Sequence, residues 1–165
     1  MYNTLMTLKE LAKKAVETYL LKGEIIEAPT MRKKAGVFIT IEKENQLRGC
    51  IGTYLPTKEN IAEETISNAI AAAFEDPRFP PVQKEELPFL SYAIYILNKP
   101  ELIKSIEELN PKKYGIIVKS KNKSGLLLPD LKGIETTEEQ VSIACQKAGI
   151  DKEKITIYRF TVIKQ

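Results

Sequence analysis

The stretch VFITIEKENQLRGCIG, residues 37–52, decides how this chain begins to fold. Apolar and polar residues alternate over Val37–Ile41, and apolar residues return over Gln46–Ile51 after a short polar break. Alternation on both sides of a polar turn predicts a β-hairpin. In the second strand we expect Leu47 and Ile51 to face one side of the sheet.

The second strand of this hairpin brings together an arginine and a thiol. Arg48 and Cys50 are two residues apart, so they are expected to share the opposite face. Gly49 and Gly52 weaken a strand, and such glycines commonly mark a bulge or a close approach of another backbone. A neighbouring cation lowers the pKa of a thiol and raises its reactivity. Cysteines in strands are also frequently small core residues, and both interpretations of Cys50 stay open.

Beyond the hairpin, the chain alternates between predicted helices and predicted strands. Helical spacing of apolar residues predicts helices over residues 5–22, 58–75 and 137–148, and β alternation predicts strands over 92–97, 114–119, 125–128 and 155–162. Most strands can pair as hairpins with helices between them. This pattern indicates an α+β fold with antiparallel sheets and flanking helices, in one domain of 165 residues.

Composition and charge exclude several classes of function. The chain is 43% hydrophobic and 28% charged, with a formal net charge of +3, which is ordinary for a globular protein. No apolar run approaches the ~20 residues of a membrane span, and no signal peptide pattern is visible, so we expect a cytoplasmic protein without membrane contact. Because acidic residues are interspersed with basic ones, nucleic-acid binding is not expected.

The sequence contains no histidine. This excludes Ser-His-Asp and Cys-His nucleophile pairs and the HExxH zinc site. Two cysteines, Cys50 and Cys145, cannot form a four-thiolate zinc site, and no metal is expected. Neither GxGxxG nor GxxxxGK[ST] occurs, so no cofactor is expected either. Cys145 falls on the apolar stripe of its predicted helix, where core packing is its expected role.

Arginine is rare in this chain, with four residues against 21 lysines. We expect it to be kept where a planar guanidinium with several donors is required. Arg48, Arg78 and Arg159 all lie in apolar or proline-rich surroundings. Asp76 and Arg78 have two interpretations. They form an anchor for an acidic ligand, with Asp76 orienting the guanidinium, or an internal ion pair that clamps the loop after the helix.

Several segments resemble a known family. They occur in the family's order and are GVFIT (36–40), LRGCIGT (47–53), NAIAAAF (68–74), DPRFPP (76–81), ELP (86–88), GLLLP (125–129) and YRF (158–160). The resemblance runs from about residue 5 to residue 163, and the combination of LRGCIG with DPRFPP is specific. On these residues the chain is identified as a member of the AMMECR family.

The resemblance implies a two-part α+β fold with the family hexapeptide, residues 47–52, near a cleft. The larger subdomain is expected at about residues 1–75 plus 134–165, and the smaller at about 76–133. The biochemical function of the family is not established. The resemblance also implies that the gene is associated in prokaryotic genomes with those of Memo-like and radical S-adenosylmethionine proteins, which suggests that the chain is one component of a modification system.

Two functional hypotheses arise from these residues, and we favour the first. The chain is a binding or accessory protein for a peptide, a small molecule or a partner protein, with a cleft formed by Arg48, Gly49, Gly52, Thr53, Asp76, Arg78 and Arg159. Alternatively, it is an enzyme in which Cys50, activated by Arg48, acts as a nucleophile or redox thiol.

Overall fold

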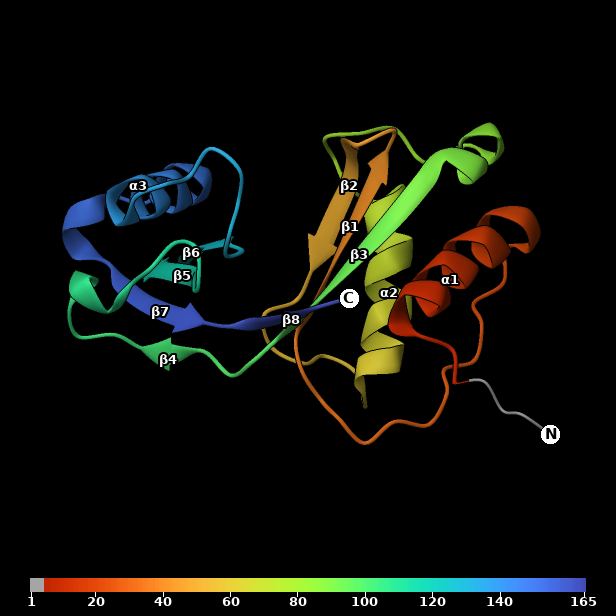
Figure 1. Cartoon of the computed structure of the whole chain (residues 1–165), viewed down its shortest axis with the longest axis horizontal. Coiled ribbons are helices and arrows are strands. Elements are labelled where there is room, and N and C mark those ends of the chain that lie inside the picture. The colour runs from red at the N-terminus through yellow and green to blue at the C-terminus, as the bar shows by residue number, and fades with distance from the viewer. Residues whose placement is uncertain (1–4) are drawn as a thin grey trace. The chain divides into compact units, whose positions relative to one another are not determined.

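The computed structural model describes residues 5–165, and the chain divides into two compact units (Figure 1). The first unit comprises the chain up to Ile96 together with Ile163–Gln165, and the second comprises Leu97–Val162. The chain therefore leaves the first unit once and returns to it at its end. Both units combine helices with an antiparallel sheet, so the predicted α+β class is confirmed.

The first unit is a four-stranded sheet with two long helices on one face (Figure 1). Its elements are α1 (Leu8–Lys22), β1 (Val37–Lys43), β2 (Gln46–Gly52), α2 (Ile61–Phe74), the 3-10 helix η1 (Lys84–Phe89), β3 (Leu90–Leu97) and β8 (Val162–Lys164). The strand order is β2-β1-β3-β8, which leaves β2 at an edge. Alternate residues of β1 and β3, such as Ile39 and Ile94, are fully buried against the helices.

The predicted hairpin forms between β1 and β2, and it contains a bulge at the arginine. Its turn uses Glu44 and Asn45 at φ 52° and 66°, the backbone twist that two-residue hairpin turns require. Ile41 pairs with Gly49 while Glu42 pairs with Leu47, so Arg48 is the extra residue. We expected Leu47 and Ile51 to face the same side of the sheet, and this prediction is wrong. Because of the bulge, Leu47 pairs with Glu42 and lies on the opposite side from Ile51, where it is 43% exposed.

Gly49 allows α2 to approach the sheet closely. A Cβ atom at this position would overlap the carbonyl oxygen of Ala72 in α2. Small side chains on the helix, including Ala69 and Ala73, are buried at the same interface. The glycine therefore fixes the distance between β2 and α2, as expected for a strand glycine at a close backbone approach.

The second unit is a separate four-stranded sheet covered by one helix. Its elements are β4 (Glu101–Leu102), the 3-10 helix η2 (Ile106–Glu108), β5 (Gly115–Ser120), β6 (Lys123–Leu127), α3 (Thr137–Ala148), the 3-10 helix η3 (Lys152–Lys154) and β7 (Thr156–Phe160), with strand order β4-β7-β5-β6. Val141, Ala144 and Cys145 of α3 pack with Val118 and Leu127 of the sheet. Cys145 is thus a core residue, and burial raises the pKa of its thiol.

The expected subdomain boundaries are corrected by this division. Residues 76–96 belong to the first unit because β3 pairs with β1 along its whole length. Residues 134–162 belong to the second unit because α3 and β7 complete its core. The strand expected over 155–162 is also divided, since β7 ends at Phe160 and β8 joins the first sheet.

Replacing Gly49 tests the close approach of α2. We expect Gly49→Ala to lower the free energy of unfolding by about 1–3 kcal/mol, because the added methyl group meets a backbone carbonyl that cannot rotate away. Thermal unfolding should show a melting temperature lower by roughly 3–10 °C. Leu47→Ala, at an exposed position of the same strand, serves as the control. Equal melting temperatures for Gly49→Ala and the wild type would contradict the assignment.

Candidate functional site

The loop that follows α2 binds the free edge of β2. The Cys50 N–H donates to Asp76 Oδ2 at 3.0 Å, and Arg78 Nη2 donates to the Cys50 carbonyl oxygen at 3.5 Å. A carboxylate and a guanidinium thus take the places that the C=O and N–H of a further strand would occupy. Unpaired edge strands invite association with other chains, and this side-chain clamp covers the edge at Cys50.

Asp76 and Arg78 form an internal ion pair, which is one of the two arrangements that the sequence left open. Asp76 is 4% exposed, and its carboxylate accepts from Arg78 Nε at 3.1 Å, from Nη2 at 2.8 Å and from the Arg78 N–H at 3.0 Å. These bonds, chiefly those from the guanidinium, lower the pKa of Asp76 to about 2. The Arg78 side chain nevertheless remains 52% exposed, so the pair is a clamp that also presents a cation.

Arg48 is buried and occupied by another carboxylate. Its Nε and Nη2 donate to the two oxygens of Glu86 at 2.9 and 3.0 Å. Glu86 lies in η1 and also accepts from Lys43 at 3.1 Å. The Arg48 guanidinium is the main reason that the pKa of Glu86 falls to about 2. The expectation that Arg48 lies beside Cys50 in an accessible groove is therefore wrong, because the bulge and Glu86 direct it into the protein.

Phe79 lies between the arginine of the hexapeptide and the arginine of the proline-rich loop. The Cζ atom of Arg48 is 5.9 Å from the centroid of its ring, and that of Arg78 is 5.5 Å away. Both distances suit cation–π attraction. The two sequence segments LRGCIG and DPRFPP are thus joined by one aromatic ring as well as by the clamp on Cys50.

Cys50 is half-buried, and its sulfur lies beside a side chain of the neighbouring strand β1. Sγ is 3.3 Å from Thr40 Oγ1, the residue that pairs with Cys50 across the hairpin. The pKa of Arg78 is raised mainly by its hydrogen bonds to Asp76 and to a smaller extent by the nearby Cys50 sulfur. Of the two arginines near this strand, Arg78, already paired with Asp76, is thus the one whose guanidinium donates to the Cys50 backbone.

Three other residues expected in the cleft have packing roles. Gly49 is covered by α2, and Gly52 lies under the ring of Phe38, which a Cβ atom would overlap. Thr53 is half-buried and donates to the carboxylate of Glu64 at 2.7 Å. These three residues shape the end of β2, and none of them presents an exposed polar side chain to a ligand.

Glu64 has a structural role that sequence reasoning missed. This carboxylate of α2 is 1% exposed and accepts four hydrogen bonds, from Thr53 Oγ1, Thr57 Oγ1, the Thr57 N–H and the Lys58 N–H. Burial opposes its ionisation, but the four bonds together lower its pKa. Glu64 therefore fastens the loop between β2 and α2. The sequence signal for this role is a pair of threonines, Thr53 and Thr57, shortly before a helix whose first turn is acidic.

Arg159, the last residue of the expected cleft, belongs to the second unit. Its guanidinium lies 4.4 Å from the centroid of the Tyr114 ring, and Nη1 donates to the Glu108 carbonyl at 2.7 Å. Nε is 3.5 Å from the carboxylate of Glu101. All of these partners lie in the second unit, so Arg159 is described with that unit alone.

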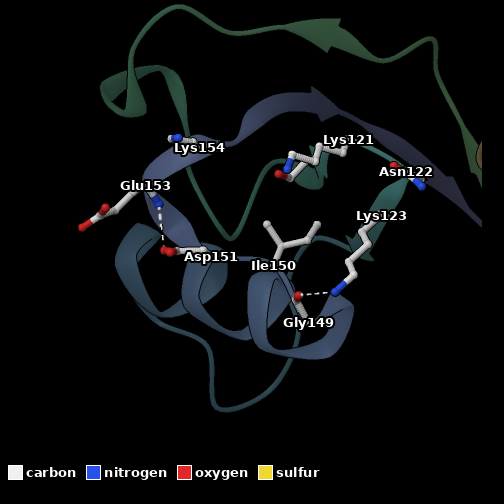
Figure 2. A pocket seen from close by; sticks show the side chains of 9 residues that line it. Lys121, Asn122, Lys123, Gly149, Ile150, Asp151, Glu153 and Lys154 are labelled. Carbon is white, nitrogen blue, oxygen red and sulfur yellow. Dashed lines mark hydrogen bonds between the residues drawn. The ribbon is translucent and has the colours of Figure 1, made fainter.

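The second unit contains a hollow of about 650 Å³ between the β5–β6 turn and the end of α3 (Figure 2). Lys123 Nζ donates to the Gly149 carbonyl at 3.0 Å, and the Asp151 carboxylate accepts from the Glu153 N–H at 3.2 Å. Lysine at a helix C-terminus satisfies free carbonyls and the helix dipole. Lys123 is thus engaged in ending α3 and Asp151 in beginning η3, and we assign no ligand to the hollow.

Metal-binding clusters and membrane-spanning helices are both absent from residues 5–165. Within this range, no group of three or more acidic, cysteine or histidine residues is arranged to hold a metal ion. None of the helices described there is both long and apolar enough to cross a bilayer.

Comparison with known proteins identifies the family. A sequence profile of the AMMECR1 family matches residues 9–165. The chain belongs to the AMMECR1 family. It is 49% identical over 158 residues to a Thermotoga maritima protein, covering 90% of this chain and 91% of that one. A crystal structure of an uncharacterized Pyrococcus horikoshii protein superposes with a TM-score of 0.88 at 36% identity, covering 95% of this chain and 88% of the other.

Another similar protein is a much longer chain. A Clostridium acetobutylicum protein is 47% identical over 163 residues, which are 94% of this chain. The present chain spans only 35% of that relative.

The two carboxylates that pair with Arg78 and Arg48 predict a specific dependence of stability on pH. The pKa values of Asp76 and Glu86 are about 2 in the folded protein, below their ordinary values of 3.8 and 4.5. Their stabilisation is therefore complete above pH ~4.5 and is lost as the pH falls towards 2. We expect Asp76 to contribute about 2 kcal/mol of this loss and Glu86 about 3 kcal/mol.

Denaturant titrations between pH 6 and pH 2 measure this dependence. Asp76→Asn and Glu86→Gln should each flatten the acid limb of the stability curve. Glu85→Gln, at an exposed neighbouring position, should leave that limb unchanged. An unchanged acid limb in both Asp76→Asn and Glu86→Gln would refute the assignment.

Proposed function

We propose that this AMMECR1-family chain is a cytoplasmic binding protein that serves as an accessory component of a modification system. Its recognition surface is the edge of β2, where Cys50, Arg78 and Phe79 adjoin. The observation that carries the proposal is Arg78, whose guanidinium is fixed by Asp76 and the Cys50 carbonyl while half of its side chain faces solvent.

A fixed, exposed guanidinium suits an anionic group on a ligand. Nε and Nη2 of Arg78 are occupied by Asp76 and Cys50, and Nη1 carries two further N–H donors. Because the side chain is already ordered, binding loses less conformational entropy than it would with a free arginine. A carboxylate or phosphate of the partner is the group that such donors bind most strongly.

The surrounding charges favour the same partner chemistry. Three cations, Lys43, Arg48 and Arg78, and two carboxylates, Asp76 and Glu86, gather near Phe79. Both carboxylates are turned inward, with 3% and 14% of their side chains exposed, whereas Arg78 is turned outward. The surface therefore presents positive charge, and the half-buried ring of Phe79 adds an apolar contact beside it.

An accessory role is supported by the long Clostridium acetobutylicum relative, in which a domain like this one is joined to a larger remainder. Domains that act together are often fused in one chain. Memo-like and radical S-adenosylmethionine proteins are the partner classes that we propose. The enzymatic alternative has less support, because the arginine expected to activate Cys50 is bound to Glu86.

Isothermal titration of the chain with a Memo-like protein and with a radical S-adenosylmethionine protein from the same organism tests the proposal. We expect one of them to bind, and Arg78→Ala to weaken binding at least tenfold. Arg78→Lys, which keeps the charge but not the fork, should give an intermediate affinity. Arg32→Ala, an exposed arginine elsewhere in the first unit, is the control for the loss of one positive charge.

Cys50→Ser separates binding from thiol chemistry and should retain full affinity. Thermal melting of every variant shows that it remains folded. Binding of neither partner, or equal affinity of Arg78→Ala and the wild type, would overturn the proposal.

A further inference from the structure

A second surface of the first unit has the features of a docking groove. It encloses about 630 Å³ between α1, the segment after that helix and the outer side of α2. Its apolar lining comes from all three segments and includes Tyr19, Ile25, Ile26, Ile66, Ile70 and Ala71. Cys50, Arg78 and Phe79 do not line it, so a partner of this groove is independent of the function proposed for the edge of β2.

Large apolar side chains are left in solvent along this groove. Ile25 is 69% exposed and Tyr19 is 37% exposed, although Ile26 beside them packs on the core. The Tyr19 ring is held by Phe74 of α2, with ring centroids 5.3 Å apart. Contiguous exposed apolar residues with a polar rim are typical of sites that bind another protein.

The shape of the groove suits a helix. Glu63, Ser67 and Ala71 line it at intervals of four residues along α2, so they are neighbours on the helix surface, and Glu75 lines it directly after the helix ends at Phe74. The two middle side chains are small and leave space between the acidic ends. Glu63 and Glu75 are twelve residues apart, which corresponds to about 18 Å along a helix. An amphipathic helix of similar length can lie in such a groove with its apolar face inward.

The charges of the rim select the kind of helix. Glu27, Glu63 and Glu75 face one cation, Lys58, so the rim carries an excess of negative charge. Within residues 5–165, Glu27 and Glu75 form no ion pair. A complementary partner therefore has basic residues near both ends, whereas an acidic segment or an anionic lipid surface is repelled.

We propose that this groove binds an amphipathic helix of a partner protein. The helix places apolar side chains at i, i+3, i+4 and i+7 in the groove and Lys or Arg residues near its two ends, about twelve residues apart. It approaches from the α1–α2 side of the first unit and has charge opposite to that of a ligand for Arg78. One chain can therefore hold two chemically different partner groups.

Fluorescence anisotropy with labelled helical peptides of about 18 residues tests the proposal. One peptide carries a Leu/Ile face and Lys residues at both ends, and a matched peptide carries Glu at the same end positions. We expect the Lys-ended peptide to bind at least tenfold more tightly, with an affinity that decreases with salt.

Two variants place the peptide in the groove. Ala71→Arg fills the groove and Glu75→Lys reverses charge at one end, and each should weaken binding of the Lys-ended peptide at least tenfold. Glu85→Lys makes the same charge change at an exposed position outside the groove and should have little effect. Melting temperatures confirm that the variants are folded. Equal binding of the two peptides, no binding of either, or binding unaffected by Ala71→Arg would overturn the proposal.

Discussion

The hydrogen bonds between the Cys50 backbone and the side chains of Asp76 and Arg78 organise the first unit. They join the edge of the sheet to the loop that ends α2, and Gly49 lets the same helix lie directly against the same strand. With the loop held there, Phe79 comes to rest near both guanidinium groups. The two hydrogen-bonding groups of an edge strand, its free N–H and its free C=O, are thereby satisfied at Cys50 without another strand.

Local pattern was sufficient to predict most elements of the fold. The alternation in Val37–Ile41 and the helical spacing before Gly23 both reflect burial on one face, and the structure has β1 and α1 there. The glycines of the second strand indicated a bulge or a close backbone approach, but they did not specify which residue is the extra one, because a bulge shifts the register by one residue without changing composition. The side of the sheet that Arg48 faces, and its pairing with Glu86 in a segment 38 residues away, therefore could not be inferred from the sequence.

At the site, contacts between residues close in the sequence could be predicted, but contacts between distant segments could not. Asp76 and Arg78 are two residues apart in the chain, so their ion pair was a foreseeable interpretation, and it is present. Arg159 was grouped with them only because arginine is rare, and its contacts instead lie within the second unit. The alternating residues 155–162 read as one strand, yet they contribute to two sheets, since alternation does not specify which sheet a strand joins.

Amide hydrogen exchange at Cys50 is the most direct test of the clamp on the edge of β2. Protection of this amide should be lost in Asp76→Ser, with exchange at least tenfold faster, because no strand can replace the lost acceptor. Amides of β1, which lies inside the sheet, should keep their rates. If the Cys50 amide exchanged equally fast in the wild type and in Asp76→Ser, the carboxylate would not be its partner and the clamp would be refuted.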